Sequence, residues 1–232
     1  MAFDYGFADA TYGCLVQMRN MDIISNNIAN VNTPGFKGDR MVFDELLGRE
    51  LKTNYDQGAL NATGNPLDMA IVGDGFFQVQ TPQGLRLTRN GSFHLSSDGT
   101  IVTAEGYQVL SAGGAPINLN PLAGPVSVDD QGGVNQAGAT VGSIGVVTVA
   151  DPTTVMKEGA NLYVGADGKA PLSQPAQGVS ITGGHLETSN VQVVTEMVDM
   201  IDSFRAFESY QKAIQTMQNI DTKSATMVGR VG

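Results

Sequence analysis

The side chains in this sequence that could do chemistry are a glycine-rich turn, two histidines, an acidic pair and one cysteine. Gly73-Asp74-Gly75 begins like a dinucleotide-binding loop, but Gln78 stands where the third glycine would be, and strand-like residues follow instead of a helix. His94 and His185 lie far apart, and no Gly-x-Ser-x-Gly nucleophile elbow accompanies them, so solvated or packing histidines are the simpler interpretation. We therefore expect no catalytic residue and no cofactor.

The acidic pair and the cysteine do not indicate a metal site either. Asp129 and Asp130 stand beside Gly132-Gly133, but the alternating oxygen ligands and the distal Glu of a calcium loop are missing, and a turn explains the pair better. A single cysteine, Cys14, excludes an intramolecular disulfide and any multi-cysteine metal site. It falls on the apolar stripe of a predicted helix, where a buried thiol is usually inert. The sequence therefore predicts no metal and no enzyme.

The charge balance excludes further classes of function. The 232 residues carry 13 Lys and Arg against 23 Asp and Glu, a formal net charge of −10, and the cations are scattered singly. Binding to nucleic acid or to a membrane surface needs a concentrated basic patch. The N-terminus also lacks the basic and apolar segments of a secretory signal, and no window approaches the length of a membrane span. We expect no nucleic-acid partner, no membrane insertion and no general secretory export.

The N-terminal segment has the spacing of a helix that faces another helix. Apolar residues recur at steps of three and four, with a mean of about 3.4 residues, close to that of a coiled coil. This stripe consists of Cys14, Met18, Met21, Ile24, Ile28 and Val31. A helix is predicted over about 4–31, and Asn32-Thr33-Pro34-Gly35 should end it, because a proline disfavours helical geometry in the residue before it.

The C-terminal segment predicts a longer helix. Ser189 and Gln192 have the spacing of a capping box, and no Gly or Pro occurs from Val191 to Met227. Its apolar stripe consists of Val194, Met197, Ile201, Phe204, Phe207, Tyr210, Ile214, Met217 and Ile220. Fully helical, this segment would extend roughly 55 Å, so a small body could not bury it along its whole length. It needs a partner helix, and the spacing gives equal weight to a two-helix core within one chain and to assembly with neighbouring copies.

The middle of the chain has the pattern of short strands. Residues 64–184 hold 21 of the 29 glycines and 8 of the 9 prolines, which separate β-branched and aromatic runs. The predicted strands are 69–72, 76–80, 85–89, 99–103, 107–110, 126–128, 145–149 and 161–164. Residues 36–66 are less decided, with 43–47 as a possible helical turn and 58–66 as extended chain. The prediction is an α+β protein with terminal helices and a central, irregular all-β domain.

Three segments resemble the signatures of the bacterial flagellar rod and hook proteins. The first, residues 26–37, reads Asn-Asn-Ile-Ala-Asn-Val-Asn-Thr-Pro-Gly-Phe-Lys. The second runs from Ala62 to Phe77 and on into Thr88-Arg89-Asn90-Gly91-Ser92-Phe93. The third is Gly184-His185-Leu186-Glu187-Thr188-Ser189-Asn190-Val191, followed by Glu196-Met197-Val198 and Arg205-Ala206-Phe207-Glu208. Together they mark the start, middle and end, so the resemblance spans nearly the whole chain.

The resemblance implies a structural subunit of the flagellar basal-body rod. Such subunits are exported unfolded by the flagellar type III apparatus and polymerise in the periplasm with other rod proteins and with copies of themselves. Their terminal helices pair as a coiled coil that lines the channel, with the β domain outside. This implies an N-terminal rod helix (1–35), an extended connector (36–66), a central β domain (67–185) and a C-terminal rod helix (186–232).

Within the family, the short chain and residues 210–217 are most similar to proximal rod proteins. The distal rod proteins are the close alternative and the hook protein, usually longer, is third. Outside the family, the alternative is a small periplasmic or surface binding module, which 6 Tyr, 9 Phe and no Trp support poorly. A hydrolase ranks below it.

The candidate assembly residues lie on the two helical stripes and in the Asn-rich segment that follows the first helix. They are Met18, Met21, Ile24, Ile28, Asn30, Asn32, Met197, Ile201, Phe204, Phe207 and Ile214. The amides of 26–32 could make hydrogen bonds between subunits or end the helix, and capping is the better supported role for Asn32.

Overall fold

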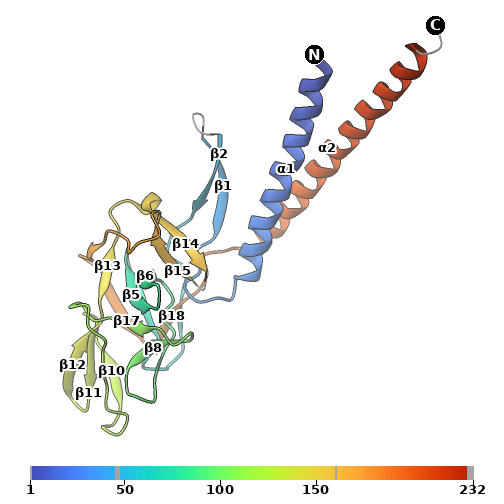
Figure 1. Ribbon diagram of the computed structural model, residues 1–232. Helices are drawn as coiled ribbons and strands as arrows, with labels where there is room; N and C mark the ends of the chain where they lie inside the picture. Colours follow the sequence, from blue (N-terminus) through green and yellow to red (C-terminus); the bar gives the residue numbers. More distant parts are fainter. Residues whose placement is uncertain (1, 45–47, 160, 229–232) are drawn as a thin grey trace. The chain divides into compact units, whose positions relative to one another are not determined.

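The computed structural model describes residues 2–44, 48–159 and 161–228, and the chain forms two compact units (Figure 1). The helical unit combines Met1–Asn30, Asp39–Asn54 and Val191–Gly232. The β unit combines Val31–Gly38 with Tyr55–Asn190. Each unit is therefore built from separate stretches of sequence, and the chain passes between the two units several times.

Two long antiparallel helices dominate the helical unit. They are α1 (Ala2–Ala29) and α2 (Val193–Val228), drawn in blue and red in Figure 1. A Cβ placed on Gly6 would lie 3.3 Å from Met217, and one placed on Gly13 would lie 2.6 Å from the Tyr210 ring. The partners on α2 move backwards as those on α1 move forwards, so the helices run in opposite directions. Gly13 is the position at which the absence of a side chain lets the two helices approach.

A β-hairpin completes the helical unit. It consists of β1 (Asp39–Asp44) and β2 (Gly48–Thr53), which pair antiparallel and contact α1. The helical turn expected over 43–47 is wrong where the structure tests it, because Phe43 and Asp44 belong to β1; residues 45–47 lie outside the described part of the chain. Arg40 and Val42 lie on one face of β1 and Met41 on the other, and this period of two is that of a strand.

Both helix boundaries differ from the expected ones. Helix α1 ends at Ala29, because the backbone N–H of Asn30 is shared between the carbonyls of Asn26 and Asn27, as is common at helix ends. The expected capping box at Ser189 is wrong: α2 begins at Val193, and its first backbone hydrogen bond runs from Glu196 to the carbonyl of Gln192. The segment before α2 is held instead by the β unit, which keeps Ser189 out of the helix.

The β unit contains short strands and one 3-10 turn (Pro152–Thr154). The strands of its largest sheet, in spatial order, are β14 (Val155–Gly159), β15 (Leu162–Gly165), β6 (Gly84–Thr88), β5 (Phe76–Thr81), β9 (Gln108–Val109), β8 (Ile101–Thr103) and β7 (Phe93–Leu95). Beside this path, β13 (Val146–Thr148) pairs with both β5 and β16 (Gln174–Pro175). A separate three-stranded sheet is formed by β10 (Val126–Val128), β11 (Gly133–Gln136) and β12 (Ala139–Ser143).

Two further strand pairs join the beginning of the β unit to its end. Strand β4 (Met69–Val72) pairs with β17 (Ser180–Gly183), and β3 (Leu60–Ala62) pairs with β18 (His185–Glu187). Both pairs are antiparallel and join segments more than a hundred residues apart, so the β unit is closed only when its last strands are in place.

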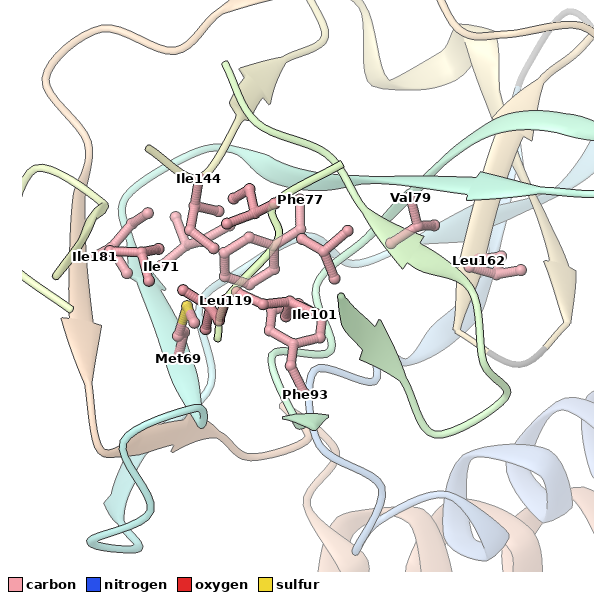
Figure 2. Close-up of a cluster of buried hydrophobic side chains, with 13 residues drawn as sticks. Met69, Ile71, Phe77, Val79, Phe93, Ile101, Leu119, Ile144, Leu162 and Ile181 are labelled. Atoms are coloured by element: carbon pink, nitrogen blue, oxygen red, sulfur yellow. The ribbon is translucent and has the colours of Figure 1, made fainter. Parts of the chain in front are cut away.

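The core of the β unit is a contiguous cluster of aliphatic and aromatic side chains. Met69, Ile71, Phe77 and Phe93 belong to it (Figure 2), and the rings of Phe77 and Phe93 meet edge to face with centroids 5.1 Å apart. A second buried cluster comprises Phe76, Leu87, Val147, Val149, Val155 and Tyr163, with Tyr55 packed against it. These clusters alternate along the strands, as the face-to-face alternation of side chains requires.

All eight predicted strand segments contain a strand, which confirms the α+β class with a helix near each end and a multi-stranded centre. The sequence did not predict β1–β3, β7, β11, β12, β14 or β16–β18. These strands are short or rich in polar residues, and they are fixed by their partners instead of by local propensity. No helix in the described ranges is both long enough and apolar enough to span a membrane.

Replacing Gly91 with Ala should destabilise the β unit strongly. A Cβ at Gly91 would lie 1.6 Å from the carbonyl oxygen of Met69, whose own N–H donates to the Gly91 carbonyl at 3.0 Å. We expect a loss of about 2 kcal/mol or more in the free energy of unfolding, measured by urea denaturation followed by circular dichroism. The matched control is Gly113→Ala, because the nearest atom to that Cβ is the Ser111 hydroxyl at 3.9 Å. Equal stability of the two variants would contradict the close approach.

Candidate assembly surface and its buried anchor

One face of α2 carries an apolar ridge, which we define as Val194, Met197, Val198, Ile201 and Phe204. Each of these side chains is between 51% and 77% exposed. The ridge exists because the stripe advances by steps of three and four that average less than the 3.6 residues of a helical turn. The stripe therefore winds around the helix, and its first half leaves the face that packs on α1.

The second half of the stripe packs against α1. Phe207, Tyr210, Ile214 and Met217 are all partly buried, and the ring of Tyr210 lies over Gly13. On α1, the buried residues Ala10, Cys14 and Ile24 lie on the same side as Gly6 and Gly13, which face α2, and the Asn27 side chain reaches Glu196 of α2. The single stripe that the sequence shows on α2 thus serves two different surfaces.

The structure accordingly separates the candidate assembly residues into groups. Met197, Ile201 and Phe204 are on the exposed ridge, and Met18 on α1 is also half-exposed. Phe207 and Ile214 are partly buried on the α1-facing side of α2, while Met21 and Ile28 are partly buried and Ile24 is buried on α1. The Asn30 amide donates to the Asn26 carbonyl at 2.9 Å, and Asn32 is exposed in the turn after α1.

Sequence analysis missed Asn27, which joins three elements of the helical unit. Its side-chain Nδ2 donates to the Asp39 carbonyl at 2.8 Å and to Glu196 Oε1 at 3.1 Å, and its Oδ1 accepts from the Asp39 N–H at 2.9 Å. Asn27 is buried, and its side-chain amide makes hydrogen bonds with protein groups of β1 and α2 in place of water. Burial raises the pKa of the Glu196 carboxyl, while the hydrogen bond from Asn27 opposes the shift.

A second missed feature is an ion cluster in the β unit, which we call the buried anchor: Lys37, Arg89 and Glu187. Glu187 Oε1 accepts from Lys37 Nζ at 2.6 Å, and Oε2 lies 3.5 Å from Arg89 Nη1. All three side chains are almost completely excluded from solvent. Burial lowers the pKa of the Lys37 ammonium and of the Arg89 guanidinium, and the charge of Glu187 opposes both shifts.

Backbone groups supply further hydrogen bonds to the anchor, while the buried Nε of Arg89 has no hydrogen-bond partner. Lys37 Nζ also donates to the Asp56 carbonyl at 2.7 Å, and Arg89 Nη2 donates to the Gly73 carbonyl at 2.7 Å. Glu187 Oε1 accepts a further bond from the Gly58 N–H at 2.8 Å. The Glu187 carboxylate thereby holds two cations and the backbone at Gly58, so four separate stretches of chain meet at the anchor.

The chain segments that connect the two units are tied together beside this anchor. Asn190, just before α2, accepts a hydrogen bond from the Gly38 N–H through Oδ1 at 2.8 Å and donates to the Asp56 carbonyl through Nδ2 at 3.0 Å. Two glycines permit the close passage of these segments. A Cβ on Gly35, where φ is +67°, would lie 2.4 Å from the Arg89 carbonyl carbon, and one on Gly58 would lie 2.0 Å from the Thr188 oxygen. No other residue fits at either place without a shift of the backbone.

The residues first considered for chemistry either have structural hydrogen-bond partners or lie exposed. Asp129 Oδ1 accepts from the N–H groups of Gln131 and Gly133, which closes a turn and lowers the pKa of this carboxyl. His185 Nδ1 lies 2.9 Å from the Gly183 carbonyl, and His94 is exposed on β7. Within the described ranges, no group of three or more His, Cys, Asp or Glu side chains is placed to hold a metal ion.

Comparison with known proteins shows the family to which this chain belongs. Residues 17–37 match the family described as flagella basal body rod protein, residues 70–149 match the flagellar hook protein FlgE/F/G D1 domain, and residues 182–227 match the flagellar basal body rod FlgEFG protein C-terminal family. The flagellar basal-body rod protein FlgF of Caulobacter vibrioides is 37% identical over 230 residues, covering 92% of this chain and 93% of the relative. The chain belongs to the flagellar basal-body rod protein family.

Both types of rod protein are represented among its relatives. FlgF of Mesorhizobium japonicum is 35% identical, covering 82% of this chain and 84% of its own length. FlgG of Bacillus subtilis is 34% identical, covering 86% of this chain and 90% of its own length. The protein is thus a structural subunit of the flagellar rod and localises to the basal body, and the binding-module alternative is set aside.

The three segments that match rod and hook families meet in the buried anchor. Lys37 ends the first matched segment, Arg89 lies in the second and Glu187 lies in the third. The resemblance found at the start, middle and end of this rod-family chain therefore corresponds to one connected cluster in the folded molecule.

Removing the charge of Glu187 should destabilise the rod protein's β unit. Glu187→Gln leaves Lys37 and Arg89 buried without a counter-charge, and we expect a loss of about 3–5 kcal/mol in the free energy of unfolding, measured by urea denaturation. Glu105→Gln makes the same chemical change at an exposed site of this unit and should cost less than about 0.5 kcal/mol. Equal free energies of unfolding for the two variants would show that the buried anchor does not stabilise the β unit.

Acidification should favour the contact between α1 and α2 through Glu196. Because the pKa of this carboxyl is raised above its ordinary 4.5, the folded chain holds the proton more tightly than the unfolded chain. Its stabilising contribution is therefore present at low pH and is lost as pH rises through the raised pKa. Glu196→Gln should be more stable than the parent at pH 7 and show a smaller advantage at pH 4, by urea denaturation at both pH values. A constant difference between the two would contradict this assignment.

Proposed function

We propose that this rod subunit occupies the proximal part of the rod and polymerises with other rod proteins and with copies of itself. The FlgF relatives of Caulobacter vibrioides and Mesorhizobium japonicum support the proximal position, at 37% and 35% identity. A distal position is an equal alternative, because the FlgG relative of Bacillus subtilis is 34% identical over a similar share of the chain. Export through the flagellar type III apparatus is part of the same proposal.

The exposed ridge of α2 is the observation that supports a role in assembly. Five neighbouring apolar side chains, from Val194 to Phe204, are at least half exposed on one helix. Large contiguous apolar patches on a soluble chain mark sites where another molecule binds. We propose that Met197, Ile201 and Phe204 contact neighbouring subunits, together with Met18 on α1, and that Phe207 and Ile214 on α2 and Met21, Ile24 and Ile28 on α1 hold the two helices together.

The pairing of the terminal helices is proposed to be a coiled coil. Gly6 and Gly13 on α1 meet Met217 and Tyr210 on α2, which is a seven-residue step on each helix. A repeat of seven residues on both helices is the spacing of an interhelical seam. In this proposal, the rod helices 1–35 and 186–232 contact other subunits of the polymer. Residues 36–66 form the connector, and residues 67–185 form the β domain. Asn30 and Asn32 lie where the N-terminal rod helix joins the connector.

A charge on the ridge should abolish rod assembly without unfolding the chain. Ile201→Asp and Phe204→Asp each place a carboxylate where the neighbouring subunit would otherwise bury an apolar side chain. We expect loss of motility and loss of the subunit from isolated basal bodies, while urea denaturation of the purified chain still shows a folded β unit. Cryo-electron microscopy of the parent basal body would show the tier that the subunit occupies.

The matched control is Gln211→Asp, which adds the same charge to an exposed position of α2 outside the ridge. This variant should assemble and support motility. Normal motility of both ridge variants would show that the ridge is not an assembly surface.

A further inference from the structure

The buried anchor brings two like charges together. Lys37 and Arg89 are both almost completely buried, and each contacts the same Glu187 carboxylate. Burial is the main cause that lowers the pKa of the Lys37 ammonium, and the positive charge of Arg89 lowers it further. The two cations therefore repel one another inside the β unit, and the closed unit needs an anion beside them.

Without Glu187, the described residues give these cations little compensation. Lys37 Nζ would keep its hydrogen bond to the Asp56 carbonyl at 2.7 Å. Arg89 Nη2 would keep the Gly73 carbonyl at 2.7 Å, while Arg89 Nε has no hydrogen-bond partner among the described residues. A closed β unit that lacked the Glu187 carboxylate would therefore bury two positive charges with one backbone carbonyl each, which is costly.

Other groups near the two cations do not replace this carboxylate. The guanidinium carbon of Arg89 lies 5.5 Å from the centroid of the Phe76 ring, and such a contact adds attraction but no counter-charge. Asp56 and Asp74 add negative charge near Lys37 and Arg89, respectively. Both aspartates are exposed, so water and salt screen their charges. Glu187 is the buried carboxylate on which closure of the unit depends.

Glu187 is also the last member of the anchor in the sequence. It lies 150 residues after Lys37 and 98 residues after Arg89. Only residues 188–232 follow it. Its strand, β18, pairs with β3, and the preceding strand, β17, pairs with β4. One late segment therefore supplies both the missing negative charge and the strand pairs that close the β unit.

We propose that Lys37 and Arg89 hold the β unit open until Glu187 joins them, and that this open chain is the form in which the subunit is exported. Synthesis starts at the N-terminus, so both cations are present before the carboxylate. Local hairpins such as β5–β6 form in the meantime, while the closing pairs wait. A closed β unit must be unfolded again to pass as an extended chain, at a cost equal to its stability. This inference rests on the proposed type III export and names the residues that delay closure.

Refolding of the full chain tests the delay. Lys37→Met/Arg89→Met/Glu187→Gln removes all three charges, and the glutamine still offers an oxygen to the Gly58 N–H. After dilution from urea, its β unit should become resistant to protease at least about tenfold faster than that of the parent, because no charges must be buried. Glu187→Gln alone keeps both cations and should close at least about tenfold more slowly than the parent.

The matched control removes an ion pair elsewhere in the β unit. Arg86 on β6 pairs with Glu158 on β14, and the Glu158 side chain is 41% exposed. Arg86→Met/Glu158→Gln should change the closing rate by less than about twofold. The inference would be overturned if the triple variant closed no faster than the parent, or if Glu187→Gln closed as fast as the parent.

Export in cells tests the consequence of the delay. The triple variant should leave about fivefold more protease-resistant subunit in the cytoplasm than the parent, and correspondingly less in isolated basal bodies. The Arg86 and Glu158 control should be exported like the parent. Normal export of a triple variant that closes faster would also overturn the inference. Export itself would be contradicted by a different result, namely parent subunit in basal bodies of cells whose type III apparatus is inactive.

Discussion

The fold of the β unit depends on one buried carboxylate. Glu187 forms ion pairs with both Lys37 and Arg89, and these three side chains come from the segment after α1, from the residue that follows β6 and from the last strand before α2. Burying three charges is costly, and an apolar cluster would often be as stable. The ionic cluster links Lys37 and Arg89 to one carboxylate and to the carbonyls of Asp56 and Gly73. We regard the anchor as the device that fixes where the connecting segments enter and leave the β unit.

That constraint explains why the first and last strands of the β unit pair with one another. The β3–β18 and β4–β17 pairs bring the start of the unit to its end, and Gly35 and Gly58 let the backbones pass without a side chain between them. The β unit also contains local hairpins such as β5–β6 and β11–β12, but its two closing pairs join segments at the start and end of the unit and are slower to form. Its completion therefore depends on the arrival of Glu187, which precedes only α2 and the short segment before it.

The sequence predicted what local patterns determine and missed what distant partners determine. The stripes around Ile24 and Ile214 predicted both helices, and β-branched runs such as 69–72 predicted the central strands. Lys37, Arg89 and Glu187 lay inside the segments that carried the family resemblance, but a charged residue in a sequence is most often solvated, and nothing local shows that three of them meet. The capping box at Ser189 failed for the same reason, because Asn190 is already bound to Gly38 and Asp56.

The candidate assembly surface shows a further limit of periodicity. A row of apolar residues at steps of three and four on α2 looks like one seam, yet its early members, such as Ile201, are exposed and its later members, such as Tyr210, pack on α1. A helix that pairs within its own chain and still presents apolar residues on another face can take part in a polymer without giving up its intrachain partner. The intrachain pair and the proposed intersubunit contact therefore use different parts of the stripe, and the two alternatives that the spacing left open are compatible on this helix.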